Sequence, residues 1–88
     1  MILVEKIVDR HFAELDFDRI RQTYGLTKRE TEVLGLICEG LSNLDISSRL
    51  FISEYTVKDH IKKILSKMNL ESRSGIIATL LQPPRKVG

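Results

Sequence analysis

Residues Ser53–Met68, with the sequence SEYTVKDHIKKILSKM, combine a helical hydrophobic period with a cluster of positive charge. At ~100° per residue, the apolar side chains share one narrow stripe of a helix. They are Val57, Ile61, Ile64, Leu65 and Met68. The opposite face carries Tyr55, Asp59, Lys62, Lys63 and Ser66, with Lys58 beside it. The stretch therefore predicts a helix, capped by Ser53, with its apolar side in a core and its basic side exposed.

The segment before this helix predicts a shorter helix joined to it by a tight turn. Residues Ser42–Leu50 have Ser42 at the N-cap position and Asp45 at the third helical position, which is a capping-box arrangement. Phe51 and Ile52 then form the connector. A short helix followed by a longer basic one is the layout of a helix-turn-helix, whose second helix enters the DNA major groove. A basic face alone is equally typical of a solvated surface, so the preceding helix decides between the two readings.

Another helix is predicted to begin at Thr27, which forms a capping box with Glu30. It runs to Glu39, and Gly40 is placed to end it in the left-handed conformation. Its buried side comprises Val33, Leu34, Ile37 and Cys38. Cys38 is interpreted as a small core residue rather than a nucleophile, because it falls on this apolar stripe.

Both ends of the chain are also predicted to be helical. Residues 1–15 form an amphipathic helix whose stripe is Val4, Ile7, Val8, Phe12 and Leu15. This stripe must be covered by the rest of the domain, by a second copy or by an upstream domain. A short helix over Phe17–Tyr24 is capped by Asp16 and ended by Gly25. The last helix, capped by Ser72 or Ser74, carries Ile76, Ile77, Leu80 and Leu81 and stops at Pro83-Pro84.

Length and composition exclude several classes of protein. The chain has 88 residues, enough for one small domain, and a net charge of +2, so the basic helix is a local feature. The start lacks a signal-peptide or membrane-spanning apolar run, and the single cysteine suits a reducing compartment, so a cytoplasmic location is expected. No catalytic constellation, phosphate-binding glycine loop or metal-ligand spacing is present. The sequence therefore predicts neither an enzyme nor a cofactor, metal or small-molecule site.

Residues from Leu26 to about Leu81 resemble the LuxR-type (GerE-like) DNA-binding domain of bacterial transcription regulators. The matching motifs are LTKRETEVL (26–34), EGLSNLDIS (39–47), ISEYTVKDHIKKI (52–64) and KMNLESRS (67–74). The resemblance implies an all-α, four-helix helix-turn-helix bundle over 25–82. Residues 1–24 are then an additional N-terminal helical segment or linker, and residues 83–88 a loose basic tail.

The resemblance also implies roles for individual residues. Base-edge contacts are expected from Lys58, Asp59 and Lys62. Contacts to the DNA backbone are expected from Ser42, Asn43, Thr56, His60 and Lys63. The last helix is expected to mediate dimerisation on DNA, with Ile76, Ile77, Leu80 and Leu81 divided between the core and the partner. The partners implied are double-stranded DNA and a second copy of the chain, bound to an inverted repeat.

Two residues depart from the family pattern. Leu44 stands where a basic residue is usual, so one backbone contact is expected to be absent. Asp59 stands where many members have an uncharged side chain, and it either accepts from a base amine or forms a surface ion pair with Lys58, Lys62 or Lys63. His60 either contacts a phosphate or packs within the domain. An internal salt bridge is predicted between Glu30 and Arg73.

Two functions follow as hypotheses. The first is a sequence-specific DNA-binding transcription regulator, whose lysines make binding dependent on salt. The second is a protein-interaction module that keeps the fold but uses the N-terminal helix to bind a regulator or RNA polymerase. A salt titration separates them, because an apolar interface does not weaken steeply as salt rises.

Overall fold

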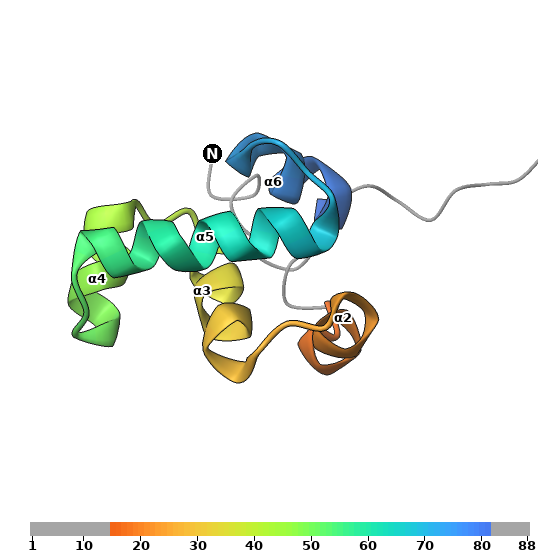
Figure 1. The fold of residues 1–88 in the computed structure, drawn as a ribbon, viewed down its shortest axis with the longest axis horizontal. Coiled ribbons are helices and arrows are strands. Elements are labelled where there is room, and N and C mark those ends of the chain that lie inside the picture. The colour runs from red at the N-terminus through yellow and green to blue at the C-terminus, as the bar shows by residue number, and fades with distance from the viewer. Residues whose placement is uncertain (1–14, 82–88) are drawn as a thin grey trace, which may run out of the picture.

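The computed structural model describes residues 15–81, and these form five helices and no strand. The helices are α2 (Phe17–Tyr24), α3 (Lys28–Cys38), α4 (Asn43–Leu50), α5 (Glu54–Met68) and α6 (Arg73–Leu81). The predicted all-α fold is confirmed, with α4 and α5 as the helix-turn-helix (Figure 1). Apart from Leu15, the helix predicted over residues 1–15 lies outside the described residues. So do Pro83-Pro84 and the C-terminal tail.

The starts of four helices are fixed by side chains that cap backbone amides. Asp16, Thr27, Ser42 and Ser53 are the N-caps of α2, α3, α4 and α5, as predicted. Each accepts a hydrogen bond from the amide three residues ahead, at 3.0–3.2 Å. The two predicted capping boxes, at the starts of α3 and α4, are both present. Ser72 directly precedes α6, whereas Ser74 lies within it.

The ends of the same four helices share one backbone device. A residue with positive φ lies one or two positions beyond each helix, and these residues are Gly25, Gly40, Phe51 and Asn69. In every case the next amide donates to the carbonyl five residues back, at 2.8–3.2 Å, which satisfies an otherwise open helical carbonyl. Gly25 and Gly40 take the left-handed conformation that their positions in the sequence predict. Phe51 and Asn69 take it without being glycine.

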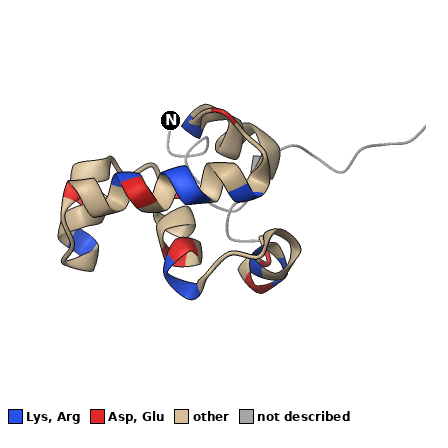
Figure 2. Ribbon diagram, viewed as in Figure 1, with Lys and Arg blue, Asp and Glu red and all other residues tan. Residues whose placement is uncertain are grey.

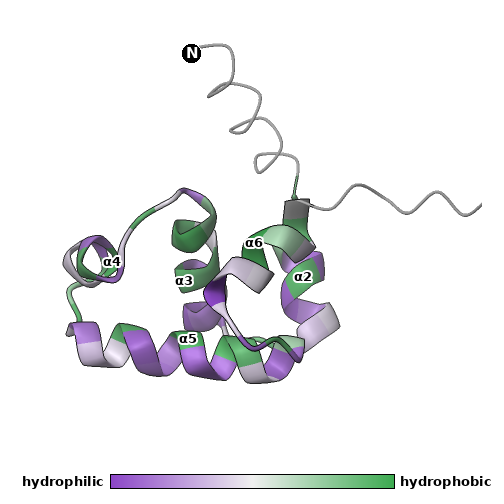
Figure 3. Cartoon of the chain, turned by 90° about the horizontal axis from the view of Figure 1, so that it is seen from above, coloured by the Kyte–Doolittle hydropathy of each residue, from purple (hydrophilic) through white to green (hydrophobic). Residues whose placement is uncertain are grey.

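The core lies on one side of α5. This helix packs against α3, α4 and α6, while α2 packs against α3. The α5 residues Val57, Ile61, Ile64 and Met68 are buried, as the hydrophobic period predicts. In the view of Figure 3, the other four described helices lie on one side of α5, and its opposite side is uncovered.

The short helix α2 closes one end of this core. Its predicted apolar face, formed by Phe17, Ile20 and Tyr24, is partly buried against the core cluster. None of its residues is fully buried. Among the described residues, no helix is long and apolar enough to cross a membrane.

Candidate nucleic-acid interface

The uncovered face of α5 carries the residues predicted to read DNA. Lys58, Asp59, Lys62 and Lys63 are all exposed on it. They lie together because residues three and four apart on a helix are neighbours on its surface. Figure 2 shows basic and acidic positions alternating along this helix. The structure therefore brings the three predicted base-contact residues onto one accessible surface.

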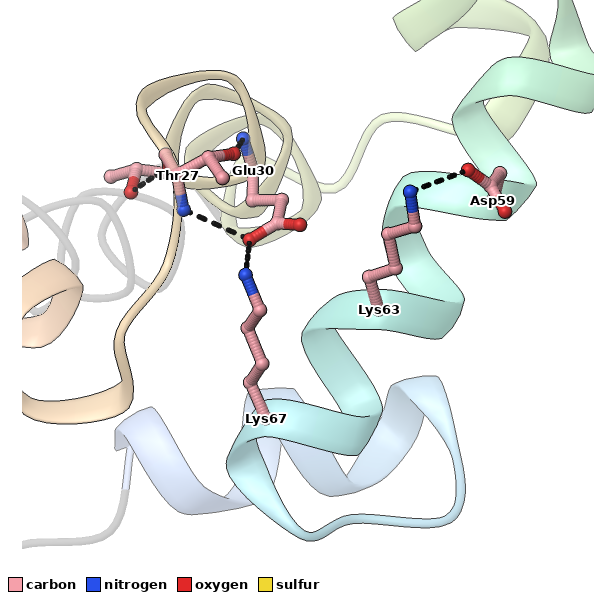
Figure 4. A network of polar contacts seen from close by, with 6 residues as sticks. Thr27, Glu30, Asp59, Lys63 and Lys67 are labelled. Atoms are coloured by element: carbon pink, nitrogen blue, oxygen red, sulfur yellow. Dashed lines mark hydrogen bonds and ion pairs between the residues drawn. The ribbon is translucent and has the colours of Figure 1, made fainter.

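Charge on this face is unevenly paired. Asp59 Oδ2 lies 3.3 Å from Lys63 Nζ, so of the three lysines proposed as its ion-pair partners the structure selects Lys63 (Figure 4). Within residues 15–81, neither Lys58 nor Lys62 forms an ion pair. These two ammonium groups are therefore free to meet an external anion such as phosphate.

The first turn of α5 is rigidly capped. The Ser53 hydroxyl accepts from the Thr56 amide at 3.0 Å and also lies 3.0 Å from the Thr56 hydroxyl. Thr56 is half-exposed, beside the lysine face. His60 is half-buried, and its Nδ1 atom has no hydrogen-bond partner in the described part of the chain. His60 is therefore partly packed within the domain but makes no hydrogen bond there through Nδ1, and its contact with phosphate stays a prediction.

The N-terminus of α4 is held by a residue from α6. The Arg73 guanidinium donates to Asn43 Oδ1 at 2.6 Å and to the carbonyl oxygen of Leu41. Ser42, the N-cap of α4, is exposed. The two residues expected to contact the DNA backbone from α4 are therefore fixed in place by capping and by Arg73.

The predicted salt bridge between Glu30 and Arg73 is wrong. Glu30 Oε1 instead accepts from Lys67 Nζ at 2.7 Å and from the Thr27 amide at 2.9 Å (Figure 4). Arg73 is engaged at the start of α4. Lys67 lies at the edge of the basic face of α5, near enough to the start of α3 for its long side chain to reach the buried carboxylate.

The Glu30–Lys67 pair joins α3 to α5 inside the fold. Glu30 is 3% exposed. Burial by itself would raise the pKa of its carboxyl, but the hydrogen bonds from Lys67 and from the Thr27 amide outweigh burial, so the pKa is lowered. The carboxylate is therefore charged at neutral pH and anchors the C-terminal half of α5. Sequence reasoning missed this role of Lys67, whose signal was only its position beside the apolar stripe.

Three large apolar side chains around the helix-turn-helix are exposed. Phe51 in the turn is 92% exposed, Tyr55 at the start of α5 is 81% exposed, and Leu44 in the first turn of α4 is 60% exposed. Leu44 thus presents an apolar surface where the resemblance leads one to expect a basic residue.

Helix α6 is divided between the core and the surface. Ile76 is fully buried in the core cluster, whereas Ile77 and Leu80 are partly buried against it. The side chain of Leu81 lies outside the described set. Of the four residues expected at a dimer interface, Ile76 is therefore a core residue in the single chain.

Cys38 is buried, as its position on the apolar stripe of α3 predicts. Burial, followed by the nearby Glu39 carboxylate, raises the pKa of its thiol to about 12. The thiol therefore stays protonated at neutral pH, which is unlike a nucleophilic cysteine. Across residues 15–81 there is no group of three or more His, Cys, Asp or Glu side chains that could hold a metal ion.

Comparison with known proteins identifies related sequences. The GerE model of bacterial regulatory proteins of the luxR family matches residues 24–80. The DNA-binding transcriptional activator DevR/DosR of Mycobacterium tuberculosis is 41% identical over 66 residues, covering 73% of this chain and 30% of that protein. The nitrate/nitrite response regulator NarL of Escherichia coli is 43% identical over 76 residues, which cover 83% of this chain and 35% of that protein.

A third relative is the transcriptional regulatory protein DegU of Brevibacillus brevis. It is 53% identical over 49 residues, covering 56% of this chain and 21% of that protein. The chain therefore spans about a third or less of the length of these relatives. No solved structure is significantly similar to it.

Proposed function

Because the chain belongs to the luxR (GerE) family of bacterial regulatory proteins, we propose that it is a sequence-specific DNA-binding transcription regulator or the DNA-binding part of one. Helix α5 enters the major groove, and α4 lies across the phosphate backbone. The observation that carries the proposal is the uncovered face of α5, where Lys58 and Lys62 are exposed and, within residues 15–81, have no carboxylate partner.

Base reading is assigned to Lys58, Asp59 and Lys62. A lysine ammonium donates to guanine O6 and N7, and a carboxylate accepts from cytosine N4. Asp59 is held by Lys63 in the single chain, so base contact requires this exposed ion pair to be shared or broken. Such pairs contribute only about 0–1 kcal/mol, so the exchange has a low cost.

Backbone contacts are assigned to Ser42, Asn43, Thr56, His60 and Lys63. The first two lie at the start of α4, where exposed amides and the positive end of the helix dipole favour a phosphate. Thr56 and His60 flank the lysine face on one side. Lys63 supplies a further positive charge once it is released from Asp59. These contacts position α5, and base edges then decide the sequence.

The active species on DNA is proposed to be a homodimer formed through α6. A two-fold dimer requires two half-sites related by the same axis, which is an inverted repeat. The partly exposed apolar side chains of α6 support this assignment, because a second copy would cover them.

The test begins with selection of bound sequences from random duplex DNA, using the 88-residue chain. Affinity for the selected site is then measured with Lys58→Ala and Lys62→Ala, and with Lys28→Ala, an exposed lysine of α3, as the control. We expect each α5 variant to lose about 1–3 kcal/mol of binding free energy and to relax the selected sequence at one position. The control should bind like the unmodified protein.

A salt titration completes the test. Binding through several lysines should weaken steeply as salt rises. A plot of the logarithm of the binding constant against the logarithm of the salt concentration should fall with a slope of about −0.9 per phosphate neutralised. If affinity is insensitive to salt and to both α5 substitutions, the reading face is wrongly assigned. A protein-interaction module would then be the better description.

A further inference from the structure

Tyr55 is a large exposed residue at the start of α5 that contributes nothing to the core of the described chain. It is 81% exposed, and it is not among the partly buried side chains that pack against the core cluster. Folding therefore does not require an aromatic ring at this position. Single exposed apolar residues are common on protein surfaces, so the meaning of Tyr55 depends on where on α5 it lies.

Tyr55 lies near the middle of the uncovered face of α5. At ~100° per residue, it points within about 30° of the direction opposite to the buried stripe. The residues of that stripe are Val57, Ile61, Ile64 and Met68. Figure 3 shows this side of α5 free of the other described helices. When such a helix lies in the major groove, the middle of its exposed face meets the floor of the groove, where the base edges are.

Tyr55 also occupies the leading end of the helix. It is the second residue of α5, and helical side chains lean toward the N-terminus. The N-terminal residues of a recognition helix are the ones that contact base edges. The first turn is held by the Ser53 hydroxyl, which accepts from the Thr56 amide at 3.0 Å. A tyrosine has only two rotatable side-chain angles, so little conformational entropy is lost when its ring is fixed against a base.

The charges beside Tyr55 favour an apolar group over a phosphate as its partner. Asp59 is its neighbour one turn along the helix surface. Glu54, the preceding residue, is exposed and forms no ion pair within residues 15–81. Carboxylates repel a phosphate oxygen but do not oppose contact between the ring and an apolar group. In the major groove, the apolar group that a base presents is the C5-methyl of thymine.

We propose that the ring of Tyr55 contacts the C5-methyl group of a thymine and makes Tyr55 a further specificity-determining residue of α5. This inference rests on the proposed function. Tyr55 and Asp59 are ~6 Å apart along the helix axis, and successive bases are ~3.4 Å apart, which corresponds to about one to two base pairs. The thymine therefore lies at this separation from the position at which Asp59→Ala relaxes the selected sequence.

The test uses the 88-residue chain and the duplex selected with it. Each thymine of the duplex is replaced in turn by uracil, which removes only the methyl group. One replacement per half-site, at the position defined above, should lower the affinity of the unmodified chain about fourfold, as expected for one methyl group lost from an apolar contact. In Tyr55→Ala the same replacement should have no effect. Tyr55→Phe should retain the fourfold difference, because the ring is kept.

The matched control is Phe51→Ala, which removes the other highly exposed aromatic ring beside the helix-turn-helix. Phe51 is 92% exposed, and this variant should retain the fourfold difference between thymine and uracil. The urea midpoint of Tyr55→Ala should equal that of the unmodified chain, which separates lost discrimination from unfolding.

Three outcomes would overturn the role of Tyr55 and leave the proposed function intact. The first is sequence-specific binding that is equally strong with thymine and uracil at every position. The second is a difference between the two bases that persists in Tyr55→Ala. The third is a loss of affinity in Tyr55→Phe without any loss of methyl discrimination in Tyr55→Ala, which would assign the hydroxyl to the DNA backbone.

Failure of the proposed function would look different. No sequence would be selected from random duplex DNA, and Lys58→Ala and Lys62→Ala would bind DNA like the unmodified chain. That result would reject both the proposed function and the thymine contact.

Discussion

At the scale of single residues, the Glu30–Lys67 pair is the one ion pair that joins two different helices within residues 15–81. Glu30→Ala removes the acceptor for both Lys67 and the Thr27 amide. We expect the free energy of unfolding to fall by about 2–3 kcal/mol, less than the roughly 3–5 kcal/mol of a fully buried pair, because the Lys67 side chain is 34% exposed. Urea denaturation measures this change.

The matched control for Glu30 is Glu32→Ala, which removes a carboxylate from the same helix. Glu32 pairs with Arg29 at 3.1 Å on the surface, where both side chains are nearly half exposed. Removing this carboxylate should lower the free energy of unfolding by less than about 1 kcal/mol. If the free energy of unfolding falls equally in Glu30→Ala and Glu32→Ala, the buried pair contributes no more to stability than the surface pair.

Glu30 also makes stability depend on pH. The pKa of its carboxyl is lowered below the ordinary value of 4.5, so the folded chain binds this proton less readily than the unfolded chain. The stabilisation is fully present above pH 4.5 and is lost as pH falls through the lowered pKa. Urea midpoints between pH 6 and pH 3 should drop, and Glu30→Gln should make the drop smaller. An unchanged pH profile in Glu30→Gln would assign the acid sensitivity to other carboxylates.

The error over Arg73 shows what residue patterns do not predict. The capping box makes Glu30 identifiable from local spacing, because both partners lie within one turn. Its cation lies 37 residues away. Choosing Lys67 over Arg73 requires knowing how α3, α5 and α6 pack, and no short-range pattern contains that information.

At the scale of elements, left-handed residues end four of the helices, and the turn of the helix-turn-helix uses Phe51. Its φ is 59°, a conformation that L-residues with side chains adopt only at a cost. Because the ring is 92% exposed, Phe51→Gly loses little packing. We expect it to raise the free energy of unfolding by about 1 kcal/mol, measured by urea denaturation.

The converse substitution is Gly25→Ala at the end of α2, where φ is 70° and the added methyl group meets nothing within 4 Å in the part of the chain that the structure describes. Only backbone strain changes, so we expect the free energy of unfolding to fall by about 1 kcal/mol.

The outcome that would contradict the prediction for the turn is a lower free energy of unfolding in Phe51→Gly. It would show that the aromatic ring contributes contacts in solution.

Helix starts were predictable at this scale, whereas the two left-handed helix ends that are not glycine, at Phe51 and Asn69, were less so. Each N-cap side chain accepts a hydrogen bond from the amide three residues ahead, so its position can be predicted from local sequence alone. These residues are Asp16, Thr27, Ser42 and Ser53. Phe51 was predicted only as part of a connector. Its left-handed backbone lets the Ile52 amide donate to the Ser47 carbonyl at the end of α4, and a phenylalanine side chain gives no sign of that conformation in the sequence.

At the scale of the whole molecule, the uncovered face of α5 results from how the helices are distributed. The hydrophobic period predicts which side of α5 is apolar, and that side is buried. That α3, α4 and α6 all pack on it follows from long-range contacts, which periodicity does not specify. The same contacts decide that Ile76 lies in the core while Ile77, 100° further round α6, stays partly accessible.

This division of α6 allows folding and dimerisation to be tested separately. Ile76→Asp places a charge in the core and should unfold the domain. Ile77→Asp should leave the domain folded but weaken assembly on an inverted repeat tenfold or more, at least ~1.4 kcal/mol, because a charge would be buried against the second copy. Affinity for a single half-site should stay unchanged. Gln22→Asp makes the same charge change on the exposed side of α2 and serves as the control. If Ile77→Asp weakens half-site binding as much as binding to the repeat, α6 acts through the fold of one chain, and the dimer interface must be sought elsewhere.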